Sequence, residues 1–202
     1  MIILCSNGLS SAAVMSEVRP YFADARRALL VVTADNVYKA DNYHVPRCKD
    51  ELRELGLSVD TFDIDTDNIH EMLLYDAVEF IGGNPFYLLR SIREHHAEPV
   101  IREIAEQKIL IGWSAAAFVF SPTLELVNEY SPEMNTVGLE DLSALNLTSV
   151  EVLLHYSRYV DRFERLEERC RGYELRRQTE VVRLNDGDAV IVERNMARLI
   201  RA

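Results

Sequence analysis

Short apolar runs alternate with longer amphipathic segments from the start of the chain to residue 112. The short runs are rich in Val, Ile and Leu, which is typical of buried strands. Regular alternation of strands and helices favours a mostly parallel sheet covered by helices on both faces. We therefore predict an α/β three-layer sandwich. The expected strands are residues 2–5, 28–33, 59–64, 77–81 and 109–112, and the expected helices are residues 17–26, 47–55, 69–75, 86–90 and 97–107.

The remainder of the chain has a different pattern. Residues 148–156, 179–184 and 188–193 look like strands, and residues 158–175 look like a charged helix. No linker rich in Pro, Gly or Ser separates this part from the rest, so it should complete the same sheet or flank it. With 202 residues, of which 48% are hydrophobic, the chain can bury one large core. We expect residues 1–202 to form a single domain.

The charge and the cysteines limit the partners. The formal net charge is −11, and no Lys/Arg run is interleaved with aromatic residues, which argues against nucleic acid and anionic membranes. The start "MIILCS" lacks the features of a signal peptide, and no apolar run reaches about 18 residues, so we expect a cytoplasmic protein. Cys5, Cys48 and Cys170 are far apart, which suggests reduced thiols. No pair of cysteines has zinc spacing, and neither a metal nor a cofactor is expected.

Two loops should lie at the carboxyl edge of the sheet, where α/β proteins build their sites. In one loop Gly82 and Gly83 follow a strand, and Asn84-Pro85 open a helix. Paired glycines let backbone N–H groups approach a developing negative charge, as in an oxyanion hole. A tight turn that needs positive φ is the alternative. The other loop, "IGWSAAAF", places Ser114 where a nucleophile elbow would lie, although a small residue in a tight turn fits the same pattern.

A serine nucleophile needs a base and a carboxylate. Among the five histidines only His155 ends an apolar, strand-like run in the last third of the chain, so it is the best candidate for the base. It could equally be a strand-end histidine bonded to backbone. Asp186, in "RLNDGDAV", could orient the imidazole, and Asp188 is the alternative. Asp-Gly is also a strong hairpin signal, which would explain Asp186 without catalysis.

The segments "FIGGNPFYLL" and "IGWSAAAFVFSPT", followed by a strand-end histidine and a late acidic-Gly turn, resemble the peptidase S51 family. That family includes alpha-aspartyl dipeptidase (peptidase E) and cyanophycinase and has a class I glutamine amidotransferase-like fold. The resemblance implies a serine peptidase acting on small, Asp-containing peptides. It also implies Ser114 as nucleophile, His155 as base, Asp186 as carboxylate, Gly83 and Ala115 as oxyanion donors, and Asn84 beside the substrate.

The resemblance extends to a substrate-binding cation, but with departures. Arg165 falls where the family carries an arginine that would grip a substrate carboxylate, although most residues of this charged helix should simply face water. Ala116 stands where the family commonly has Gly, and Leu154 where it has Pro. A binding or regulatory relative that lost activity is therefore the second hypothesis. In either case we expect a monomer or a homodimer.

Overall fold

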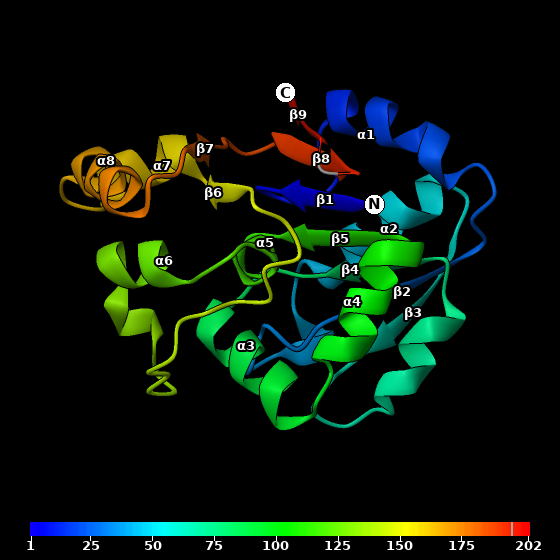
Figure 1. The fold of residues 1–202 in the computed structure, drawn as a ribbon. Helices are drawn as coiled ribbons and strands as arrows, with labels where there is room; N and C mark the ends of the chain where they lie inside the picture. The colour runs from blue at the N-terminus through cyan, green and yellow to red at the C-terminus, as the bar shows by residue number, and fades with distance from the viewer. Residues whose placement is uncertain (195) are drawn as a thin grey trace.

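A seven-stranded sheet runs through the centre of the molecule in the order β3-β2-β4-β5-β1-β8-β9 (Figure 1). The structure is a computed structural model that describes residues 1–194 and 196–202. Strands β1 to β5 pair in parallel, whereas β8 and β9 are antiparallel additions at one edge. The strands are β1 Ile2–Cys5, β2 Arg27–Val31, β3 Ser58–Phe62, β4 Ala77–Phe80, β5 Ile109–Trp113, β6 Glu151–Leu153, β7 Val181–Arg183, β8 Ala189–Glu193 and β9 Met196–Ile200.

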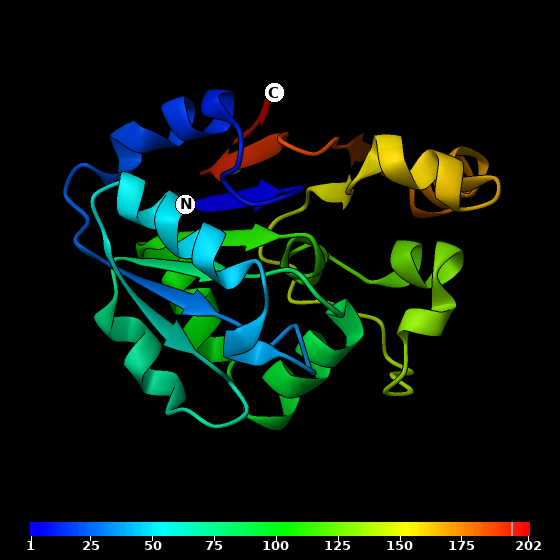
Figure 2. The same ribbon diagram turned by 180° about the vertical axis from the view of Figure 1, so that it is seen from behind.

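Helices cover both faces of this sheet (Figures 1 and 2). Alternate residues of β4 show how the core divides, because Val78 and Phe80 belong to one buried cluster and Ala77 to another. The predicted α/β sandwich with a mostly parallel sheet is confirmed. The helices are α1 Ala12–Val18, α2 Val45–Glu54, α3 Pro85–Glu94, α4 Glu98–Gln107, α5 Ala115–Phe120, α6 Glu125–Tyr130, α7 Tyr156–Arg162 and α8 Leu166–Arg177, with 3₁₀ helices η1 Arg19–Phe22, η2 Lys39–Asp41, η3 Ile69–Leu74 and η4 Pro132–Met134.

Two predicted helices differ from the structure. The helix expected at 17–26 begins earlier, at Ala12, where the Ser11 hydroxyl accepts the Val14 N–H at 3.2 Å. It tightens into η1 near Pro20, which has no N–H to continue an α-helix. The helix expected at 158–175 is two helices, α7 and α8, separated at Arg165, whose φ is +56°. None of the described helices is long and apolar enough to cross a membrane.

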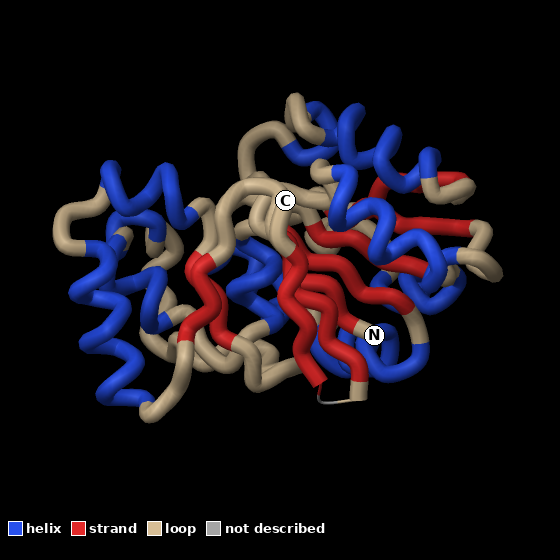
Figure 3. The backbone as a smooth tube through the Cα atoms, turned by 90° about the horizontal axis from the view of Figure 1, so that it is seen from above, coloured by secondary structure: helices blue, strands red, loops and turns tan. Residues whose placement is uncertain are grey.

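The carboxyl-terminal part divides between two sheets. Strand β8 joins the central sheet, while β6 and β7 pair in parallel as a separate two-stranded sheet (Figure 3). Strand β9 was not predicted, because Met196–Ile200 is mostly exposed and lacks an apolar run. In Figure 1 the arrows of β1 and β5 point toward the side on which α6, α7 and α8 lie. The loops after the central strands therefore open beside these later elements.

Candidate active site

Ser114 lies on a sharp turn between β5 and α5. Its backbone has φ +52° and ψ −115°, a conformation that non-glycine residues rarely adopt. A Cβ on Gly112 would lie 2.5 Å from the Phe120 ring, so only glycine allows the helix to fold back so closely. The Ser114 N–H donates to the Cys5 carbonyl at 3.1 Å, which ties the turn to β1. This geometry presents the hydroxyl at the carboxyl edge of the sheet, with Ala116 fully buried in the turn.

His155 and Asp186 lie beside this hydroxyl. The Ser114 Oγ is 3.1 Å from His155 Nε2, and His155 Nδ1 is 2.5 Å from Asp186 Oδ1. A proton on Nδ1 that is donated to Asp186 leaves Nε2 free to accept the serine proton. His155 lies two residues beyond the end of β6 and has a left-handed backbone, with φ +53°, so its ring leaves the strand end toward Ser114. The three residues come from three distant parts of the chain, and the fold brings them into one chain of hydrogen-bonding contacts.

Burial sets the protonation of the imidazole. His155 is only 5% exposed, and desolvation lowers its pKa below the ordinary value of a histidine. The hydrogen bond to Asp186 opposes this shift by stabilising the cation, whereas the charge of Arg158 adds to it. The neutral imidazole, which is the form that can accept a proton, is thus favoured near neutral pH.

Ser6 and Arg158 also contact this constellation, and the sequence analysis missed both. The Ser6 hydroxyl accepts the His155 backbone N–H at 2.9 Å, and Arg158 Nε lies 2.9 Å from Asp186 Oδ2. Ser6 directly follows β1. Sites in α/β proteins form at the carboxyl ends of parallel strands, so the argument that pointed to the loops after β4 and β5 could also have pointed to Ser6. Arg158 lies one helical turn beyond His155, a spacing that brings side chains together on a helix.

The paired glycines after β4 lie against the serine turn. A Cβ on Gly82 would be 2.9 Å from Ser114 Cβ, and one on Gly83, whose φ is +152°, would be 2.2 Å from the Ala34 carbonyl oxygen. The serine turn and the Ala34 backbone can therefore lie this close to the loop only because both positions are glycine. Within the described residues, the N–H groups of Gly83 and Ala115 donate to no protein acceptor. They are free to bind a ligand.

Asn84 and Arg165 have other partners. The Asn84 Oδ1 caps α3 by accepting the N–H groups of Phe86 and Tyr87, and its Nδ2 donates to the Met134 carbonyl at 2.7 Å. It orders the loop that carries Gly83. Arg165 pairs with Glu168 at the start of α8, and its side chain is 65% exposed. The structure does not bring it into contact with Ser114, His155 or Asp186, and its role in binding substrate stays a prediction.

The fold and this edge define an α/β protein of the class I glutamine amidotransferase-like type, with a serine where a nucleophile would lie. The model of peptidase family S51 matches residues 1–200. The chain belongs to peptidase family S51.

Individual relatives support the same assignment. An uncharacterized peptidase of Listeria monocytogenes serovar 1/2a is 33% identical over 132 residues, which are 63% of this chain and 64% of that protein. The match to a peptidase of Listeria innocua spans 57% of each chain. Peptidase E of Escherichia coli is 26% identical over 161 residues, covering 78% of this chain and 69% of its own. The chain thus spans less than two thirds of the length of the first two relatives.

Solved structures show the fold over the full length. A crystal structure named for peptidase E, from Listeria monocytogenes EGD-e, has a TM-score of 0.78 at 22% identity and covers 100% of this chain and 98% of its own. A peptidase from an acI-B1 actinobacterium has a TM-score of 0.68 at 14% identity, with 100% of this chain and 87% of that chain covered. At these identities the likeness concerns the fold.

Proposed function

We propose that the protein is a serine peptidase that hydrolyses small peptides with Ser114, His155 and Asp186. The observation that carries the proposal is the 3.1 Å separation of Ser114 Oγ and His155 Nε2, at a strained turn on the carboxyl edge of the sheet. Unrelated surface serines rarely combine a positive φ with a buried histidine partner. Membership of family S51 supports the same chemistry.

The proposed reaction follows from the positions of these groups. Ser114 Oγ attacks the peptide carbonyl carbon while His155 Nε2 takes its proton, and the carbonyl oxygen becomes an anion. The free N–H groups of Gly83 and Ala115 are the donors that would bind this anion. Collapse breaks the C–N bond, and His155 returns the proton to the leaving amine. Water then hydrolyses the acyl ester by the same route, with no cofactor.

The proposed substrates are small peptides that contain Asp. Peptidase E is the name of one of the relatives, and a substrate carboxylate needs a cation near the nucleophile. Arg165 is the predicted cation, but in the structure it pairs with Glu168. Arg158 lies closer to the reacting groups, in contact with Asp186, and its side chain is 60% exposed. A monomer or homodimer in the cytoplasm stays a prediction.

The alternative of an inactive binding protein rested on Ala116. Its methyl group is buried without flattening the turn, since Ser114 keeps φ +52°. Nothing in the elbow therefore favours the inactive alternative over the peptidase.

A fluorophosphonate probe tests the proposal directly, because it reacts only with an activated serine. We expect labelling of about one equivalent at Ser114, and Asp-Leu should be cleaved while Asn-Leu is cleaved slowly. Ser114→Ala should abolish labelling and lower the rate of cleavage by several orders of magnitude. Ser58→Ala is the matched control, since Ser58 is exposed at the amino end of β3, away from the site. Dipeptide cleavage that survives Ser114→Ala at the wild-type rate would disprove the mechanism.

A further inference from the structure

Glu79 is an acid in the middle of the central sheet. It lies in β4, whose four residues are all buried, and its own exposed fraction is 0%. Neither carboxylate oxygen has a hydrogen-bond partner among the described residues. Burying a polar group without a partner destabilises the folded state, and burying an ionised carboxylate destabilises it more. An unpaired acid at this position needs a ligand or a proton.

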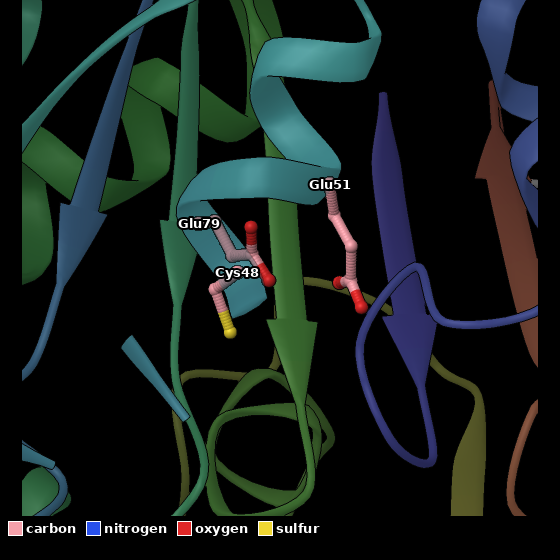
Figure 4. Close-up of side chains that lie close together, drawn as sticks. All are labelled: Cys48, Glu51 and Glu79. Atoms are coloured by element: carbon pink, nitrogen blue, oxygen red, sulfur yellow. The ribbon is translucent and has the colours of Figure 1, made fainter. Parts of the chain in front are cut away.

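The side chain of Glu79 points to the face of the sheet that α2 covers. Figure 4 shows it together with Cys48 and Glu51, which project from α2. The thiol sulfur and one oxygen of each carboxylate all lie within 4.8 Å of one another. Cys48 is 0% exposed and Glu51 9%, and their spacing of three residues places both on one face of the helix. Three ligand-type groups therefore converge between one helix and one strand.

The donor set indicates the kind of ion. A thiolate with two carboxylates suits zinc and related transition metals, whereas calcium and magnesium prefer oxygen alone. A four-coordinate zinc ion with bonds of about 2.0–2.3 Å holds its ligands about 3.3–3.8 Å apart, so the groups would have to close by at most about 1–1.5 Å. Charge also balances. Arg47 Nη1 lies 2.5 Å from Glu51 Oε1, so Arg47 and a divalent cation would neutralise the three anionic ligands.

We propose that Cys48, Glu51 and Glu79 bind one divalent transition-metal ion of the zinc class between α2 and β4. The ion has a structural role. Glu51 Oε2 accepts the Leu9 N–H at 3.1 Å, and Arg47 donates to the Asn7 carbonyl at 3.0 Å, so the ligand cluster is tied to the loop that follows β1. The proposal does not depend on peptidase activity.

Cobalt absorption tests the site in the full chain after treatment with EDTA. We expect Co²⁺ to saturate at one equivalent with a thiolate-to-metal band in the near ultraviolet, and Zn²⁺ to abolish that band. Cys48→Ala should remove the band. Cys170→Ala is the matched control and should keep it, because Cys170 is also a fully buried free cysteine but lies in α8. Absence of the band in the wild type, or a band that survives Cys48→Ala, overturns the proposal.

A second variant keeps the test independent of the folding of Cys48→Ala. Glu79→Gln preserves the shape of the side chain and removes its charge, and it should weaken Co²⁺ binding by at least about tenfold. Zn²⁺ should raise the Tm of the wild type, since a ligand that binds the native state stabilises it, and should raise the Tm of Glu79→Gln by clearly less at the same Zn²⁺ concentration. Equal Co²⁺ affinity and equal Tm shifts in the two proteins would show that Glu79 is simply a protonated acid.

Discussion

The Ser6 hydroxyl holds the backbone of His155. It accepts the His155 N–H at 2.9 Å, and it lies 3.3 Å from Asp186 Oδ1. The two residues are 149 positions apart, and they join the loop after β1 to the turn after β6. Ser6 is fully buried, so water cannot replace this contact. The position of the proposed base thus depends on a residue of the central sheet edge.

Ser6→Ala should therefore affect both stability and rate. The His155 N–H would lose its acceptor inside the protein, which costs about 1–3 kcal/mol of unfolding free energy. The histidine would also be held less firmly, so kcat should fall while KM changes little. Urea unfolding and dipeptide kinetics measure the two effects. Ser58→Ala, at an exposed site, should change neither, and a wild-type kcat in Ser6→Ala would contradict a positioning role.

Much of the fold could be predicted from periodicity, because buried parallel strands are apolar runs. Each expected strand from residue 2 to residue 112 overlaps a strand of the structure. Hydrophobic periodicity did not predict the features of secondary structure that depend on tertiary contacts or on one residue's backbone conformation. The break before α8 depends on a left-handed Arg165, and β9 forms by pairing with β8 although four of its five residues are exposed.

The candidate site could be predicted in part for a related reason. Ser114 directly follows β5 and Gly83 lies three residues beyond β4, so the sheet itself places both at one edge. Asp186 and Asp188 could not be told apart, because a difference of two residues in a turn depends on how that turn folds. Glu79 lies in an apolar run, and nothing in the run reveals that Cys48 and Glu51 face it from another element.

Asp186→Asn and Asp188→Asn should have opposite consequences. Asp186 contacts His155, and an amide there would favour the wrong tautomer, so kcat should fall by about 10³–10⁴-fold with a small change in stability. Asp188 accepts the N–H groups of Asn185 and Ala202 and pairs with Arg201. Its replacement should lower the unfolding free energy by about 1–3 kcal/mol and leave kcat near wild type. Steady-state kinetics and urea unfolding measure both effects in both variants. A large loss of kcat in Asp188→Asn with a near-normal kcat in Asp186→Asn would contradict the assignment.

The pH profile should report the depressed pKa of His155. Because the base must be neutral, kcat/KM should rise with pH through a midpoint below about 6.5, the ordinary value. Arg158→Gln removes a nearby positive charge, so the midpoint should move up, and the shift should be small because Arg158 is well exposed. Arg162→Gln, on the same helix, is the control. A midpoint that moves down, or moves equally in both variants, would exclude this electrostatic link.

The same shift predicts how stability depends on pH. Since the folded pKa of His155 lies below the unfolded value, the unfolded chain binds more protons between the two values. The contribution of this group to the unfolding free energy is therefore complete above about pH 6.5 and declines as the pH falls toward the folded pKa. The unfolding free energies of the wild type and His155→Gln, measured with urea across this range, should converge as the pH falls.

Gly83→Ala should disable the proposed oxyanion site. The new Cβ would lie 2.2 Å from the Ala34 carbonyl oxygen, so the loop must move and take its N–H with it. Losing one oxyanion donor lowers kcat by about 10²–10³-fold. Gly56→Ala is the matched control, since Gly56 also has positive φ, at +90°, but no atom lies near its Cβ. It should lose only about 1–2 kcal/mol of stability. Equal kcat in the two variants would argue against the role of Gly83.

Ser114 and His155 should behave as one unit in a double-mutant cycle. If Ser114 attacks the carbonyl while His155 accepts its proton, the loss of either removes the same stabilisation of the transition state. Ser114→Ala and His155→Ala should each lower kcat by several orders of magnitude, and the double variant should be little slower than either. The residual rate should come from the oxyanion donors and from substrate binding. Steady-state kinetics on an Asp-containing dipeptide measures all four proteins. Additive losses would mean that the two residues act separately, and that the 3.1 Å contact is not the route of the proton.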